Sequence, residues 1–380
     1  MSRMRAATRL LALAFMAVIL TSCWDQRSIQ ETSYFTSLGI DFDEKQKLFS
    51  VYGTLITMAD VAKTEGPSGK AAPAYLGHGE GESPQLALEA LYRSTQLRPS
   101  LDHLMTIVVK QRALSRMPDI LDSINRARTV RYNVFIAATT EPLDELLASD
   151  TFFNSPMYTF LYAHRVHSPA APPVQMISLQ AFVRQFYEES HTTFLPLLKL
   201  DRASWKQGNK TKTYIFYDGA HAIAGRKARA ALNEKILQGV KWYHSNPTGT
   251  FLEVRDDAGK FVAILIVTKG KGRISYSENA KGGAFKAVIR VQAYIYELHD
   301  MAGERQLETW AQNGIREKLE QSLASGRESR VDLIGLEDKL YRHHPAAWKR
   351  LKRDGREVTD LPCEVVVDVK VTNSGKLKLK

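Results

Sequence analysis

Cysteine is scarce in this sequence, which has two, Cys23 and Cys363, among 380 residues. A framework of disulfides is therefore excluded, and the stability of the fold must come from packing. Long hydrophobic runs are scarce as well. The run from Leu10 to Leu20 has eleven residues, whereas a membrane-spanning helix needs about 20. No later stretch approaches that length, so we expect no membrane-spanning helix in the rest of the chain.

The short motifs of several enzyme classes are also missing. The chain has no His-Glu-x-x-His, no Gly-x-Ser-x-Gly, no phosphate-binding loop ending in Gly-Lys-Ser/Thr and no Cys-x-x-Cys. Gly77, Gly79 and Gly81 alternate, but no Lys-Ser/Thr pair follows them, which disfavours a phosphate cradle. An enzyme is therefore the least favoured class of protein, and we expect neither a cofactor nor a metal site.

Four side-chain pairs could carry chemistry, and each has a simpler interpretation as exposed or solvated groups. No carboxylate lies near His164 and His167. His343 and His344 are adjacent and would point in different directions on a helix. The paired acids are more often solvated charge than an acid/base dyad. The pairs are His164 with His167, His343 with His344, Glu188 with Glu189, and Asp256 with Asp257.

Positive charge exceeds negative charge, with a formal net charge of +11. The charges are mixed along the chain, and no basic run is interleaved with aromatic residues, so nucleic-acid binding is disfavoured. The run Lys349 to Arg353 is interpreted as a solvated helix face, with an anionic headgroup or an acidic partner as the alternative, and Trp348 as a core or interface residue. For a protein outside the cytoplasm, this balance favours solubility and attraction to anionic lipid headgroups.

The N-terminal residues have the three parts of a secretory signal. Arg3, Arg5 and Arg9 precede the apolar run, and Leu20-Thr21-Ser22-Cys23 follows it. A branched apolar residue three positions before cysteine, with small residues at the cut, is typical of a bacterial lipobox. We therefore predict that residues 1–22 are a lipoprotein signal peptide and that Cys23 is the lipidated residue. Cys363 would then have no partner within the chain, and we interpret it as a small buried hydrophobe.

The remaining chain alternates between strand and helix patterns, which predicts a multi-domain α+β protein with central, mostly antiparallel sheets flanked by helices. We expect an N-terminal domain over 23–200, of one or two subdomains, and a C-terminal domain over 201–380, divided at the polar, turn-rich segment 201–212. Among the predicted elements are a helix beginning at Ser83-Pro84, a hairpin around Asp218-Gly219, and helices over 227–242 and 304–325, the last ended by Gly326. An alternating strand over 365–371 closes the set.

Several of these segments, taken in order, resemble the C-subunit lipoproteins of spore nutrient germinant receptors, the Ger(x)C family. The segments are Cys23-Trp24-Asp25, Leu38-Gly39-Ile40-Asp41, the block from Val331 to Trp348-Lys349, and the closing stretch from Leu361-Pro362 to Ser374-Gly375. Departures from the family pattern occur at Ser22, Ser28, Glu337 and Gly355. The resemblance covers nearly the whole chain after Cys23.

The resemblance implies a non-catalytic, lipid-anchored subunit of mixed α/β fold, needed for nutrient-triggered germination. Such a subunit assembles with an A-type subunit and a transporter-like B-type subunit at the inner spore membrane, on its extracytoplasmic face. Cys23 is the one residue to which a family role is carried over. The alternative function is a lipid-anchored extracytoplasmic solute-binding protein, which would have two similar lobes around a ligand cleft.

Overall fold

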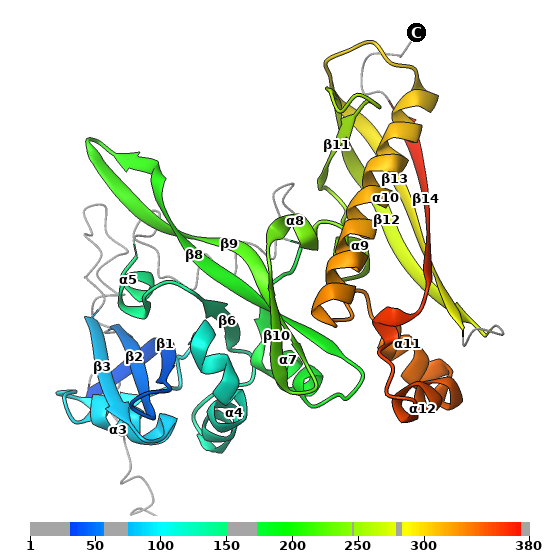
Figure 1. Ribbon diagram of the computed structural model, residues 1–380. Helices are drawn as coiled ribbons and strands as arrows, with labels where there is room; N and C mark the ends of the chain where they lie inside the picture. The colour runs from blue at the N-terminus through cyan, green and yellow to red at the C-terminus, as the bar shows by residue number, and fades with distance from the viewer. Residues whose placement is uncertain (1–30, 57–74, 150–172, 245–246, 279–282, 374–380) are drawn as a thin grey trace, which may run out of the picture.

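The structure, a computed structural model, describes residues 31–56, 75–149, 173–244, 247–278 and 283–373, which form two β-sheets with their helices (Figure 1). Cys23 and the predicted signal peptide lie outside the described residues, as do His164 and His167. No helix in the described ranges has both the length and the apolar character needed to cross a bilayer.

The first sheet has ten strands, and its centre is parallel. In space the strands follow the order β10-β9-β8-β6-β5-β1-β2-β3, with β4 beside β1 and β7 beside β6. Strands β1, β5, β6 and β8 run parallel, and the strands on both sides of them pair antiparallel. The bounds are β1 (Thr32–Asp43), β2 (Leu48–Ile56), β3 (Tyr75–Gly81), β4 (Arg98–Ser100), β5 (Thr106–Lys110), β6 (Phe135–Thr139), β7 (Ile177–Ser178), β8 (Thr192–Gln207), β9 (Lys210–Ala224) and β10 (Lys227–Leu232).

Side chains on both faces of the parallel strands are buried. In β5, Ile107 and Val109 join one apolar cluster with residues of α3, α4 and α7, while Val108 joins a second cluster with Leu143 and Leu146 of α5. This explains the uninterrupted apolar sequence of β5 and β6, because a strand covered on both faces has no polar side. The helices are α3 (Pro84–Tyr92), α4 (Met117–Arg126), α5 (Leu143–Leu147) and α7 (Leu179–Phe186), with a 3-10 helix at Gln111–Arg116.

Helix α3 begins as the sequence predicts and packs on the alternating glycines of β3. The Ser83 hydroxyl accepts a hydrogen bond from the Leu86 amide at 3.2 Å, with proline at the first helical position. A Cβ on Gly79 would lie within 3.0 Å of the Ala87 carbonyl oxygen and the Leu91 amide nitrogen. The glycines therefore let the helix backbone approach the strand. This close packing explains why glycine recurs at alternate positions of β3.

The second sheet has four strands in the order β11-β12-β13-β14, and β14 runs parallel to β13. A parallel pair needs a crossover connection, here made by α10, α11 and α12. Helix α10 lies along one face of this sheet (Figure 1). The bounds are β11 (Phe251–Arg255), β12 (Phe261–Ser277), β13 (Ala284–Leu298), β14 (Cys363–Asn373), α8 (Glu234–Leu237), α9 (Lys241–His244), α10 (Glu304–Ser329), α11 (Leu336–His343) and α12 (Pro345–Arg353), with a 3-10 helix at Val358–Asp360.

One apolar cluster joins the two sheets. It contains the inward residues of β11–β14 and the buried face of α10, and it extends to Phe194 of β8, Ala220 and Ala222 of β9 and Leu232 of β10. The far end of the first sheet therefore shares a core with the second sheet. The expected domain division after residue 200 falls inside β8, between Phe194 and the residues of β9 and β10 that belong to the shared cluster.

The α+β fold class and the closing strand are confirmed. Val367, Val369 and Val371 of β14 are buried and alternate with exposed residues. Helix α10 also forms, but it runs through Gly326, which is buried against Val331 and Leu333. The helix ends where Arg330 adopts φ 52°, in the left-handed region.

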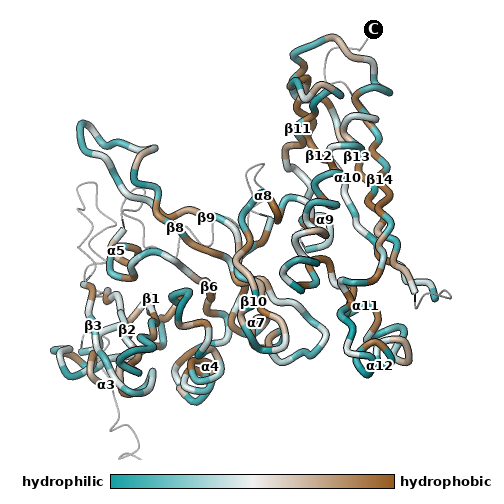
Figure 2. Tube along the Cα trace, in the orientation of Figure 1, coloured by the Kyte–Doolittle hydropathy of each residue, from teal (hydrophilic) through white to brown (hydrophobic). Residues whose placement is uncertain are grey.

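Two element predictions between the sheets were wrong. Residues 201–212 form the projecting end of the β8–β9 hairpin, whose tip is hydrophilic in Figure 2, and Asp218-Gly219 lies within the continuous strand β9. The helix predicted over 227–242 is replaced by β10, α8 and α9. Sheet pairing prevailed here over local helix propensity, because Ala228 and Ala230 pair with β9.

Candidate functional site

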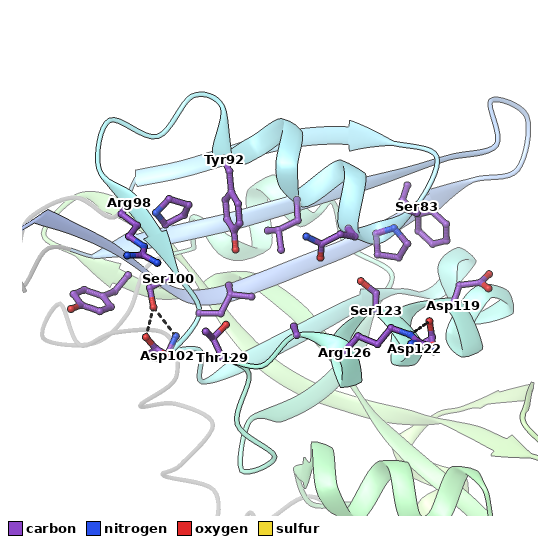
Figure 3. Close-up of a pocket in the computed structure, with 18 of the residues that line it drawn as sticks. Ser83, Tyr92, Arg98, Ser100, Asp102, Asp119, Asp122, Ser123, Arg126 and Thr129 are labelled. Carbon is purple, nitrogen blue, oxygen red and sulfur yellow. Dashed lines mark hydrogen bonds and ion pairs between the residues drawn. The ribbon is translucent and has the colours of Figure 1, made fainter. Parts of the chain in front are cut away.

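A cleft of about 920 Å³ opens in the first sheet between α3, β4 and α4 (Figure 3). Its floor is formed by the apolar side chains Phe49, Leu88 and Leu101, and its rim is charged. The cleft lies where β1 begins, since Thr32 and Tyr34 line it. Its size is within the range of small-molecule sites.

Ion pairs occupy much of the rim. Arg116 pairs with Asp119 at 2.7 Å, and Arg126 pairs with Asp122 at 2.9 Å. The Ser100 hydroxyl donates to Asp102 at 2.7 Å. Three of the carboxylates that line the cleft are therefore already paired. These carboxylates do not form an acid/base pair of the kind that hydrolases use.

Tyr92 reaches into the cleft from α3 (Figure 3). Burial raises the pKa of its hydroxyl to about 12, so the phenol stays protonated at neutral pH. A neutral phenol is suited to hydrogen bonding with a polar ligand and is a poor nucleophile. Tyr92 thus offers a neutral hydrogen-bonding group in the cleft and not an activated nucleophile.

The remaining histidine pair does not form a metal site. His343 is the last residue of α11, whereas His344 lies between α11 and α12 with its ring 5.0 Å from that of Tyr276. Over the described parts of the chain, no group of three or more His, Cys, Asp or Glu side chains is placed to hold a metal ion.

The paired acids hold local structure. Glu188 lies 3.8 Å from Arg342, across the contact between the first sheet and α11. Asp256 accepts hydrogen bonds from the amides of Ala258 and Lys260, and Asp257 accepts one from the Trp310 indole at 3.1 Å. These carboxylates stabilise a turn and the docking of α10.

Most of the basic run on α12 is neutralised. Lys352 pairs with Glu337 at 2.6 Å, Arg353 with Asp354 at 3.4 Å, and Arg350 with Glu278. Trp348 donates its indole N–H to Glu337 and packs edge-on against Tyr341. The run therefore holds α12 against its neighbours.

Two aspartates whose roles the sequence did not reveal lie in the motifs that resemble the germination family. Both carboxylate oxygens of Asp41 accept a hydrogen bond from the Arg112 guanidinium, at 2.8 and 2.7 Å. Asp332 is buried and accepts hydrogen bonds from the amides of Ile334, Gly335 and Glu337. Burial raises the pKa of Asp332, and these backbone hydrogen bonds oppose the shift. The spacing Asp332-x-x-Gly335 before a helix was the available signal, because Asp favours such turns.

Cys363 is half-buried at the start of β14, whereas a buried side chain was expected. Burial raises the pKa of its thiol to about 11, which keeps it largely protonated and unreactive at neutral pH.

The fold and these contacts define a class: a two-sheet α+β protein in which the motif carboxylates of Asp41 and Asp332 hold local structure. Residues 25–200 match the profile of the spore germination protein N-terminal domain, and residues 218–375 match that of the spore germination B3/GerAC-like C-terminal domain. The chain therefore belongs to the Ger(x)C family of spore germination proteins.

A solved structure shares this fold. The crystal structure of the GerBC protein is similar with a TM-score of 0.53 and 13% sequence identity, covering 88% of this chain and 97% of that one. No curated protein matches the sequence.

Proposed function

We propose that this protein is the non-catalytic C subunit of a nutrient germinant receptor. It is anchored through a diacylglycerol on Cys23 to the extracytoplasmic face of the inner spore membrane. There it assembles with the A-type and B-type membrane subunits. The observation that carries the proposal is family membership over both halves of the chain, together with a lipobox ending at Cys23.

The anchor turns weak contacts into effective ones. A single acyl chain holds a protein to a membrane only marginally, but a diacylglycerol supplies two chains and holds stably. Confining the body to the membrane surface raises its effective concentration near membrane subunits, so modest interfaces are enough for assembly. The protein needs no catalytic group for this role.

The solute-binding alternative requires two similar lobes around a shared cleft. The two sheets differ in strand number, strand order and helix arrangement. The cleft lined by Tyr92 lies beside the first sheet alone. Both features favour the subunit proposal over a solute-binding protein.

The test replaces Cys23 with alanine in a C-terminally tagged copy, with Cys363→Ala as the matched cysteine control. We expect Cys23→Ala to leave the spore membrane fraction and to slow nutrient-triggered germination, whereas Cys363→Ala stays at the membrane. Pull-down of the parent protein from detergent-solubilised membranes should recover two membrane partners, one of them transporter-like.

A Cys23→Ala protein that remained membrane-bound and fully active would contradict the anchor. Recovery of the parent protein alone, together with nutrient binding by the purified body in calorimetry, would favour the solute-binding alternative.

A further inference from the structure

On one face of the second sheet, the described part of the chain places no helix (Figure 1). Helix α10 covers the face to which Ala287, Ile289 and Val291 of β13 point (Figure 1). The other face carries five exposed basic residues on three neighbouring strands. We call this set the basic face: Lys269, Lys271 and Arg273 of β12, Arg290 of β13 and Lys370 of β14.

Strand register brings these cations together. Lys271 lies directly opposite Arg290, Lys269 opposite Gln292, and Gln292 in turn beside Lys370. Like charges directly opposite each other in a sheet are destabilising. Neighbouring strands are about 4.8 Å apart, so the cations form a closely spaced array around a hollow of about 650 Å³.

Few negative charges lie nearby. Asp368, beside Arg290, is the acidic residue among those that line the hollow. Within the ranges that the structure describes, no ion pair joins the five cations of the basic face to a carboxylate. The basic run of α12 is different, since three of its cations are paired. The basic face is thus a cluster of five cations with one carboxylate, that of Asp368, among the residues that line its hollow.

Two tyrosines continue the same face, Tyr294 half-buried and Tyr296 exposed. Tyr294 and Tyr296 alternate with the buried Ala293 and Ile295, so they point to the same side as Arg290. Tyr296 is 60% exposed, and its ring centroid lies 5.5 Å from that of Phe251. Tyrosine beside lysine and arginine is the composition found where proteins meet the headgroup region of a bilayer.

We propose that the basic face binds the surface of a membrane that contains anionic phospholipids. Lipid phosphates would lie over the five cations, and Tyr294 and Tyr296 would contact the headgroup region. A protein partner fits less well, because lysine is depleted at the centre of protein interfaces and three lysines belong to this cluster. A closely spaced set of cations on an open sheet face instead complements the charge of a layer of lipid phosphates.

The inference deepens the proposed function, since the Cys23 anchor would bring the body to the membrane and the basic face would then orient it. The two ideas can be separated. Binding of the body without its lipid tests the basic face alone, and membrane release of Cys23→Ala tests the anchor alone.

The experiment uses residues 24–380, which contain every described residue, and measures co-sedimentation with phosphatidylcholine vesicles with and without phosphatidylglycerol. We expect binding only to the phosphatidylglycerol vesicles, with loss at high salt. Each Lys or Arg near an anionic membrane strengthens binding roughly fivefold. The variant Lys269→Glu/Lys271→Glu/Arg273→Glu should therefore bind on the order of a hundredfold more weakly.

The matched control reverses three exposed cations elsewhere, Lys227→Glu/Lys235→Glu/Arg305→Glu, for the same change in net charge. The control should keep most of the binding. Equal loss in both variants would overturn the proposal, because net charge alone would then explain it. Absence of vesicle binding by the parent body would also overturn it. If the basic-face variant then also lost its membrane-protein partners in the pull-down, the face would be a protein docking site.

Discussion

The two sheets differ in how their strands are covered. The parallel centre of the first sheet is buried on both faces, between α3, α4 and α7 on one side and α5 on the other. The second sheet is covered by α10 on one face and carries the basic face on the other. The difference indicates which surfaces are fixed by folding and which are available to partners. The predictions below test this contrast.

The largest effect should come from the contact between α3 and β3. Gly79→Ala places a Cβ against backbone atoms of Ala87 and Leu91, which cannot move without displacing the helix. We expect a loss of about 3 kcal/mol in the free energy of unfolding, measured by urea denaturation.

The matched comparison is Lys271→Ala on the basic face, where an exposed side chain should cost less than about 0.5 kcal/mol. Equal effects of Gly79→Ala and Lys271→Ala would remove the contrast between a covered and an open sheet.

The next effect concerns the loop that connects α10 to α11. Asp332→Ala leaves the amides of Ile334, Gly335 and Glu337 without their acceptor in a buried site. The expected loss in unfolding free energy is about 2 kcal/mol. Asp332→Asn should cost less, because its carbonyl oxygen can still accept from two of the three amides.

Asp368→Ala is the control for this prediction, since it removes an exposed carboxylate from the open face of the second sheet. If Asp332→Ala lost no more unfolding free energy than Asp368→Ala, the loop that contains Asp332 would not hold α11 in place.

Local patterns in the sequence predicted the parts of the fold that depend on them. The Ser83-Pro84 cap, the helical pattern of α10 and the alternation of β14 are each set by neighbours within the same element. The motifs on which the family resemblance was based include Asp41 and Asp332, whose hydrogen bonds hold local structure in this chain.

The wrong predictions concern segments whose structure depends on pairing with strands that are distant in the sequence. Residues 227–232 have helix-forming alanines, yet they pair with β9 over a register that no local pattern contains. The cleft lined by Tyr92 combines residues from β1, α3, β4 and α4, so its location depends on topology. The basic face was missed for the same reason: the cations of β12 are adjacent in sequence, but Arg290 and Lys370 join them only through strand register.

The smallest expected effect concerns a buried histidine of the first sheet. His221 of β9 is 5% exposed, and within the described residues neither of its ring nitrogens has a hydrogen-bond partner. Burial lowers its pKa below the ordinary 6.5. The unfolded chain therefore binds a proton more readily than the folded one, and the stability from neutral His221 is lost as pH falls from neutral through 6.5 toward the folded-state pKa.

His221→Leu should change the unfolding free energy at neutral pH by less than about 1 kcal/mol, because it removes a buried polar group that has no partner. It should also make stability fall less steeply with acidification. Part of the acid sensitivity should remain, since burial lowers the pKa of His191 as well. The measurement is urea unfolding on both sides of pH 6.5, with the exposed His103→Leu as control. An unchanged pH slope in His221→Leu would show that solvent reaches this face of β9, and the first sheet would then be less completely covered than its core indicates.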